Sequence, residues 1–129
     1  MTFPAGGKLL LVDDEPAVRK MLKMFLERRG LPVIDAASGE EALELLTSEK
    51  SSLKLLITDV TMPGMSGREL AEHAFRLNSS LPILFISGYS DSILELPEGV
   101  QCMPKPIDFK LLLAEIDRLV GPDPESQAA

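Results

Sequence analysis

Five reactive side chains stand where short apolar segments of this chain end. The segments have the length and composition of buried strands. Because parallel strands bring their carboxyl ends to one edge of a sheet, where ligands bind, we expect these side chains to meet there. They are Asp13 and Asp14 after residues 8–12, Asp59 after 53–58, Ser87 at the end of 82–87, and Lys105 after 100–103.

Three carboxylates at one sheet edge favour a bound cation. If the first and third strands are neighbours, Asp13, Asp14 and Asp59 approach to about one strand spacing, near 5 Å. At that distance two carboxylates repel by about 3 kcal/mol at an effective dielectric constant near 20. A few hard oxygen ligands suit Mg²⁺, while Lys105 supplies a further positive charge and Ser87 a hydroxyl donor. The set predicts phosphoryl transfer with Asp59 as the nucleophile.

Helical patterns separate the expected strands, so that a βα unit occurs five times. A second strand is expected over residues 31–36, where Pro32 favours an edge position. The alternation predicts an α/β fold in which helices cover both faces of a parallel sheet. The helix starts are marked by Pro16, by Ser38 with Glu41, by Ser66 with Glu69 before a helix over 67–77, and by Asp108.

Length and composition predict one globular domain. The chain has 129 residues, of which 45% are hydrophobic, and we expect a flexible lead-in over 1–7, the domain over 8–120 and a disordered tail over 121–129. A net charge of −7 argues against direct nucleic-acid binding, which needs clustered positive charge. No apolar run approaches the roughly 20 residues of a membrane span. The single cysteine fits a reducing compartment, so a cytoplasmic location is expected.

Four motifs together resemble the receiver domain of two-component response regulators. They stand in order over nearly the whole chain, from residue 8 to residue 120, and the run at 85–90 is most similar to receivers of hybrid histidine kinases. This resemblance implies a flavodoxin-like (βα)5 doubly wound sheet with strand order 2-1-3-4-5. The motifs are LVDDE at 11–15, TDVTMPGMSG at 58–67, ISGY at 86–89 and KP at 105–106.

The same resemblance implies a separate role for each acid. Asp59 would accept a phosphoryl group from a phosphohistidine. Asp14 and Asp59 would hold Mg²⁺ directly, together with the main-chain carbonyl of Thr61, and Asp13 would act through a metal-bound water. The partner would be a histidine kinase or a histidine phosphotransfer protein, with no direct nucleic-acid or membrane partner. No turnover of an external substrate is expected.

Ser87 and Lys105 would bind the phosphoryl oxygens, and a cis peptide bond is predicted between Lys105 and Pro106. Two positions depart from the family pattern. Cys102 stands three residues before Lys105, where receivers usually carry Phe or Tyr. Only residues 91–96 are available for a fourth helix before Pro97, whose ring ends a helix, so this helix is predicted to be short or irregular. A relay or phosphate-sink role is therefore favoured over a dimerising switch.

Three alternative functions are weighed against a receiver. A phosphatase with an aspartyl-phosphate intermediate usually has a cap domain, for which this chain is too short. A flavin binder needs a phosphate loop, whereas the loop after the first strand is acidic and would repel phosphate. An interaction module that is never phosphorylated would not need the acids and lysine that the chain retains.

Tyr89 is either a shield for the phosphoryl group or a half-exposed loop residue. The basic residues of the first helix are expected to form a solvated face.

Overall fold

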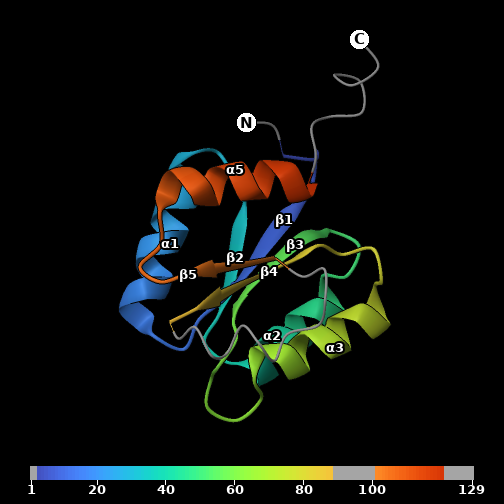
Figure 1. The fold of residues 1–129 in the computed structure, drawn as a ribbon. Coiled ribbons are helices and arrows are strands. Elements are labelled where there is room, and N and C mark those ends of the chain that lie inside the picture. Colours follow the sequence, from blue (N-terminus) through green and yellow to red (C-terminus); the bar gives the residue numbers. More distant parts are fainter. Residues whose placement is uncertain (1–2, 89–100, 121–129) are drawn as a thin grey trace.

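The computed structural model describes residues 3–88 and 101–120. In this part of the chain, strands and helices alternate as far as the fourth strand, and residues 101–120 add a fifth strand and its helix (Figure 1). The strands are β1 Lys8–Val12, β2 Val33–Ala36, β3 Leu53–Asp59, β4 Ile83–Ser87 and β5 Gln101–Pro104, and the helices are α1 Pro16–Arg28, α2 Gly39–Ser48, α3 Gly67–Leu77 and α5 Phe109–Val120.

The five strands form one parallel sheet in the order β2-β1-β3-β4-β5. Strand β1 lies between β2 and β3, with Leu10 beside Ile34 of β2 on one side and beside Leu56 of β3 on the other. Both the predicted fold class and the predicted strand order are confirmed. β2 lies at an edge, as Pro32 indicated. All five carboxyl ends therefore lie along one edge of the sheet.

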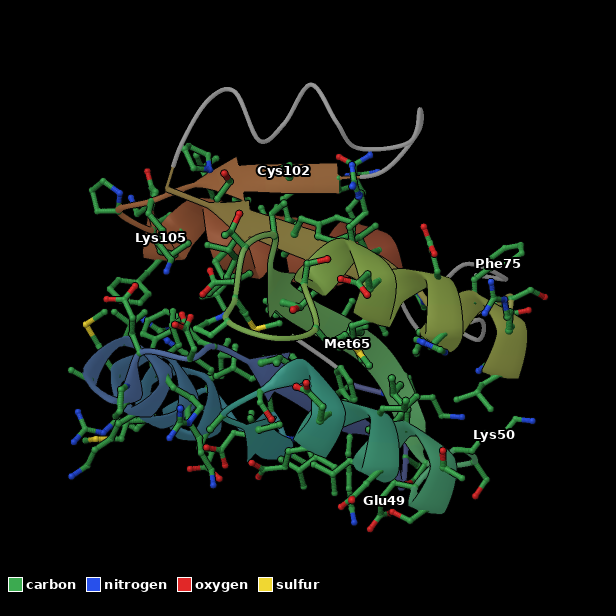
Figure 2. All side chains as sticks on the ribbon, turned by 90° about the horizontal axis from the view of Figure 1, so that it is seen from below. Glu49, Lys50, Met65, Phe75, Cys102 and Lys105 are labelled. Carbon is green, nitrogen blue, oxygen red and sulfur yellow. The ribbon has the colours of Figure 1, made fainter. Side chains whose placement is uncertain are left out.

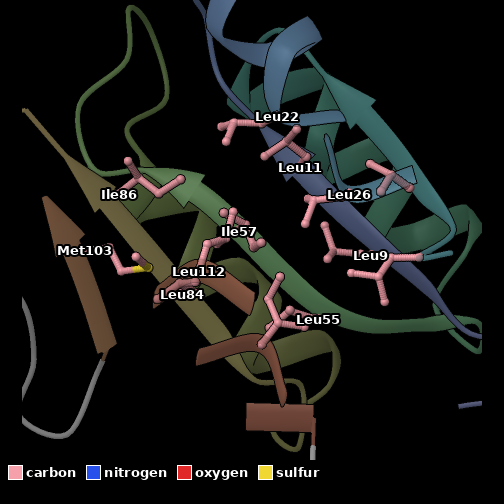
Figure 3. Packing of buried hydrophobic residues seen from close by; sticks show 13 residues of the cluster. Leu9, Leu11, Leu22, Leu26, Leu55, Ile57, Leu84, Ile86, Met103 and Leu112 are labelled. Atoms are coloured by element: carbon pink, nitrogen blue, oxygen red, sulfur yellow. The ribbon is translucent and has the colours of Figure 1, made fainter. Parts of the chain in front are cut away.

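Helices cover both faces, and each face has its own apolar cluster. Figure 3 shows the cluster under α1 and α5, where Leu22 and Leu112 pack against strand residues such as Ile57. The other cluster lies under α2 and α3 and includes Ala42 and Leu70. Successive strand residues alternate between the two clusters, as the pleat of a strand requires. The sheet is thus buried on both faces, and its polar residues are concentrated at its ends.

Local sequence signals set the ends of the helices. α1 starts at Pro16 and is followed by Gly30, whose φ of +84° suits a glycine after a helix. In α3 the expected capping box is complete, because the Ser66 hydroxyl accepts from the Glu69 N–H and the Glu69 carboxylate accepts from the Ser66 N–H. Asp108 caps α5 by accepting from the N–H groups of two residues in its first turn.

The capping box expected at α2 is only half formed. The Ser38 hydroxyl accepts from the Glu41 N–H at 3.1 Å, but the Glu41 carboxylate accepts from the Ala37 N–H at 3.3 Å instead of from Ser38. The Ser38 hydroxyl nevertheless caps the first turn of α2, because it accepts from the main-chain N–H of Glu41.

Some predicted boundaries need correction. β2 begins at Val33 and not at residue 31, because the Leu31 N–H still bonds to the Leu26 carbonyl at the end of α1. β3 includes Asp59 as its last residue. β5 ends at Pro104, one residue later than expected. The predicted fourth helix over 91–96 and the predicted tail over 121–129 lie outside the described residues, as does Tyr89.

Within the described ranges, no helix combines the length and the apolar character that a membrane crossing would require.

Candidate functional site

The three acids predicted to meet do so at the carboxyl edge of the sheet. Asp13 and Asp14 follow β1, and Asp59 ends the neighbouring strand β3. One carboxylate oxygen from each can be chosen so that all three lie within 4.8 Å of one another. Asp13 and Asp59 are buried, whereas Asp14 is partly exposed. The cluster is therefore open to solvent on the side of Asp14.

Asp13 is held in place on several sides. Its main-chain N–H donates to the Ala36 carbonyl at 3.2 Å, which extends the pairing of β1 with β2 by one residue. Its Oδ1 accepts from the Glu15 N–H at 2.9 Å, a turn that aspartate favours. Its Oδ2 is buried and receives no hydrogen bond from any described residue. The ammonium of Lys105 lies 3.4 Å from that oxygen.

The loop after Asp59 is shaped by close packing. The Thr58 hydroxyl donates to the Asp59 carbonyl at 3.0 Å, and the Gly67 N–H donates to the Val60 carbonyl at 2.9 Å. A Cβ at position 67 would lie 1.7 Å from the Asp59 carbonyl oxygen, so only glycine fits there. Figure 2 shows Met65 in this loop, and its N–H donates to Glu40 of α2 at 3.3 Å. The loop is fixed at both ends.

Lys105 reaches the acids from the end of β5 (Figure 2). Its main-chain N–H donates to the Ser87 carbonyl at 2.8 Å, and the peptide bond to Pro106 is cis, as predicted. Its Nζ lies 3.1 Å from Asp59 Oδ1 and 3.1 Å from Glu15 Oε1. With Asp13, three carboxylates thus share one ammonium group.

A cavity of about 340 Å³ opens beside these groups. Ser87 lines it and is itself buried, at the last position of β4. The predicted metal and phosphate ligands thus line one space, except for Asp13, which is fully buried and is not among the lining residues. The lining residues are Asp14, Glu15, Asp59, Thr61, Ile86, Ser87, Gly88 and Lys105.

Burial and crowding of like charges determine the protonation of Asp59. Its pKa is raised to about 8, first because the carboxyl is buried and second because Asp13 lies beside it, and Lys105 offsets only part of this rise. Burial disfavours the charged form of Lys105, but hydrogen bonds to Asp59 and Glu15 outweigh it and raise the pKa of the ammonium. In the metal-free protein at neutral pH, Asp59 therefore carries a proton for much of the time.

The same arrangement fits a hard divalent cation. Asp13, Asp14 and Asp59 offer carboxylate oxygens close together, and Thr61 lines the cavity beside them. The buried Oδ2 of Asp13 lacks a hydrogen-bond donor among the described residues, which leaves it available to a cation or to a ligand of one. Small sets of carboxylate and carbonyl oxygens suit Mg²⁺. A cation here would replace the proton on Asp59 and leave the carboxylate ionised.

Several contacts at or near the site were not predicted from the sequence. Glu15 was part of a recognised motif but was assigned no role, and it binds the Lys105 ammonium from 90 positions away in the chain. The basic residues of α1 were expected to form a solvated face, but Arg19 and Lys23 both bind Asp35 of β2 at 3.0 Å. Arg19 also donates to the Asp13 carbonyl. The expectation holds for Lys20 and Arg28, which are exposed.

The position three residues before Lys105 carries a half-buried Cys102 (labelled in Figure 2). It lies beside the buried Phe85 in the pairing of β5 with β4. Burial raises the pKa of its thiol.

Known proteins match this chain over the region that carries the motifs. Residues 9–117 match the family model described as the response regulator receiver domain. The sensor kinase CckA of Brucella abortus (strain 2308) is 33% identical over 119 residues, which cover 89% of this chain but 13% of that protein. The response regulator receiver protein CpdR of the same organism is 33% identical over 117 residues, which cover 88% of this chain and 96% of that protein.

Solved structures agree with these relatives. The crystal structure of the receiver domain from the hybrid histidine kinase CckA is 39% identical, with a TM-score of 0.79, and the match covers 89% of this chain and 100% of that one. The response regulator TrrA of Thermotoga maritima, solved in complex with Mg²⁺ and BeF, is 31% identical with a TM-score of 0.78, and the match covers 88% and 98%.

Proposed function

Because the chain belongs to the response regulator receiver domain family of two-component signalling, we propose that Asp59 accepts a phosphoryl group from a phosphohistidine with the help of Mg²⁺. The observation that carries the proposal is the position of this carboxylate. It ends β3 in a cavity between a lysine ammonium at 3.1 Å and two further acids. The Asp59 carboxylate thus has the Lys105 ammonium as one cationic partner, and the cavity leaves room for a metal cation as a second.

Four groups of this chain would hold the cation. Asp14, Asp59 and the Thr61 carbonyl would be the direct ligands, and Asp13 would act through a bound water. Mg²⁺ at this place would neutralise part of the charge on the incoming phosphoryl oxygens. The proximity of the three acids supports this ligand set. So does the solved Mg²⁺ complex of TrrA, a protein 31% identical to this chain.

The transfer itself needs an ionised Asp59. A carboxylate oxygen attacks phosphorus, the bond from phosphorus to the donor imidazole nitrogen breaks, and the bonding electrons leave with the imidazole. An acyl phosphate forms on Asp59, and the imidazole can then take up a proton from solvent. Burial and Asp13 raise the pKa of Asp59 to about 8, so losing its proton is part of activation.

Lys105 and Ser87 would receive the phosphoryl oxygens. The ammonium of Lys105 already lies against Asp59, and Ser87 lines the same cavity. Lys105 would exchange part of its contact with the acids for contact with the new phosphate, because a doubly charged anion attracts it more strongly. Both residues are fixed by main-chain pairing of β4 with the segment after β5.

The donor partner is proposed to be a histidine kinase or a histidine phosphotransfer protein. Sensor kinase CckA and receiver CpdR, each 33% identical to this chain, are the kinds of protein in which such a domain occurs. Cys102 is too small to act as the aromatic residue that follows phosphorylation in many receivers. We therefore favour a relay or phosphate sink, with no turnover of an external substrate.

The test is phosphorylation by a small phosphodonor such as acetyl phosphate in the presence of Mg²⁺. Intact mass should show one added phosphoryl group that resists acid and is lost in base. Asp59→Asn should show none. Asp14→Asn should show much less labelling at the same Mg²⁺ concentration.

Two outcomes would contradict the proposal. Equal labelling of the wild type and Asp59→Asn would remove Asp59 from the reaction. Continuous hydrolysis of an external phosphoester would favour the phosphatase alternative.

A further inference from the structure

Arg19 makes contacts that point beyond the expected ligand set, and we propose that it positions the two acids of the β1–α1 loop for the cation. Its Nη1 donates to the Asp13 carbonyl at 2.7 Å, and its Nε donates to Asp35 Oδ2 at 3.0 Å. The side chain is 18% exposed. A planar guanidinium holds two acceptors in a fixed geometry, which an ammonium cannot do. Arg19 thereby joins the acidic loop to β2.

The Asp13 carbonyl has a clear need for this donor. Asp13 is fully buried, and β1 ends one residue before it, so its carbonyl lies beyond the regular pairing of the strands. A buried main-chain oxygen without a donor is costly. With the Arg19 bond, the main-chain N–H, the main-chain carbonyl and Oδ1 of Asp13 are all held. Oδ2 is the one oxygen of this residue left for the site.

Asp14 depends on the same bond. The Asp13 carbonyl belongs to the peptide group that carries the Asp14 N–H, and this group is planar. Fixing the carbonyl therefore fixes the direction in which the chain enters Asp14. Arg19 acts through Asp13 and Asp14, so it is a positioning residue and does not bind the cation itself. This role rests on the proposed function, because it requires Mg²⁺ at the acids.

Arg19 affects a nearby cation in two opposite ways. Its positive charge repels Mg²⁺, so removing the charge alone should tighten binding. Its bond to Asp13 orders the ligands, so removing the bond should weaken binding. The sign of the change therefore separates positioning from simple electrostatics. Lys23 is a matched control, because it also lies on α1 and binds Asp35 at 3.0 Å, and no contact with Asp13 is recorded for it among the described residues.

The experiment compares wild type, Arg19→Gln, Arg19→Lys and Lys23→Gln in two measurements. The first is Mg²⁺ affinity, from amide NMR shifts during titration. Arg19→Gln should raise the Kd about tenfold, the low end for loss of a bond that orients a metal ligand. Arg19→Lys should lie between it and wild type, because one of the two acceptors can still be reached. Lys23→Gln should stay within about twofold of wild type.

The second measurement is amide hydrogen exchange in the metal-free protein. The N–H of Glu15, which bonds to Asp13, should exchange faster in Arg19→Gln and not in Lys23→Gln. Unchanged or tighter Mg²⁺ binding by Arg19→Gln, with unchanged exchange, would overturn the inference. A wild type that fails to bind Mg²⁺ would instead refute the proposed function and with it the role toward the cation, and exchange would then show only whether Arg19 orders the loop. If Arg19→Gln does not fold, Arg19→Lys carries both tests.

Discussion

Two aspartates of the same sheet each lie against an ammonium, yet their pKa values move in opposite directions. Asp35 of β2 lies 3.0 Å from Lys23 and 3.0 Å from Arg19. Burial works against its ionised form, but the two cations outweigh burial and lower its pKa. Asp59 of β3 lies 3.1 Å from Lys105, and its pKa is raised to about 8. Contact with a cation is therefore not enough to keep a carboxylate ionised.

The difference lies in how many groups share each charge. Two cations, Arg19 and Lys23, form ion pairs with the single carboxylate of Asp35, whose side chain is 29% exposed. One ammonium serves three carboxylates at the other site, and there the side chain of Asp59 is 6% exposed. Asp35 thus anchors α1 to β2 as a stable ion pair. The protonation of Asp59 can be changed by a cation, and a strongly perturbed pKa of this kind is typical of functional sites.

The largest expected effect is on the pH dependence of stability in metal-free protein. Because folding raises the pKa of Asp59 to about 8, the folded state binds more protons than the unfolded state between the ordinary value of 3.8 and about 8. Stability should fall as pH rises through this window, by up to about 1.4 kcal/mol per pH unit from this group. Asp59→Asn should remove this slope and be the more stable protein at pH 8. Urea unfolding in a chelator at several pH values measures it.

The control for this prediction is the added cation. Mg²⁺ competes with the proton on Asp59, so it should stabilise wild type most at the alkaline end and stabilise Asp59→Asn much less. A wild type whose stability relative to Asp59→Asn stays level from pH 5 to pH 8 would show that Asp59 is ionised throughout. The contrast with Asp35 would then disappear.

A smaller effect of opposite sign is expected at Asp35. Since its pKa is lowered, its contribution to stability is present above the ordinary value of 3.8 and is lost as pH falls through the folded value. Asp35→Asn should cost about 1 kcal/mol at neutral pH, a figure kept small by solvent screening. At pH 3 most of this difference should be gone, and about 1 M salt should reduce it at pH 7. An equal cost at both pH values would mean that packing, not charge, is lost.

Much of the fold and part of the site could be predicted because their signals are local. The position of Asp59 at a strand end follows from an apolar run that stops at one acid. Parallel pairing then brings the acids together whatever the details of the loops. Gly67 belongs to a recognised motif, but only the structure gives its reason, the 1.7 Å approach of a Cβ to a carbonyl.

The charge balance could not be predicted, because it depends on which distant groups meet. Arg19 looks the same in sequence as Lys20 beside it, yet one is mostly buried against Asp13 and Asp35 and the other is exposed. Helical spacing alone does not say which basic residue faces a strand end. Glu15 is the N-cap of α1 without capping it through its side chain, which binds Lys105 instead. Local rules are broken there in favour of the site.

The smallest expected effect concerns that Glu15 contact. Its side chain is 59% exposed, so Glu15→Gln should change stability by less than about 0.5 kcal/mol. It should, however, leave the Lys105 ammonium with one partner fewer and lower the negative charge at the mouth of the cavity. Labelling by an anionic phosphodonor should then be faster, by about two- to fivefold at low salt.

Glu27→Gln is the matched control, because Glu27 is an exposed acid of the same helix for which no contact with Lys105 is recorded among the described residues. The advantage of Glu15→Gln should shrink at high salt, since a surface charge acts through screened attraction and repulsion. If both variants gain equally, net charge explains the rate. If Glu15→Gln is slower than wild type, Glu15 holds Lys105 ready for the phosphoryl group and does not compete for it. In that case Glu15 would hold the Lys105 ammonium in place by an ion pair, as Asp35 holds the cations of α1.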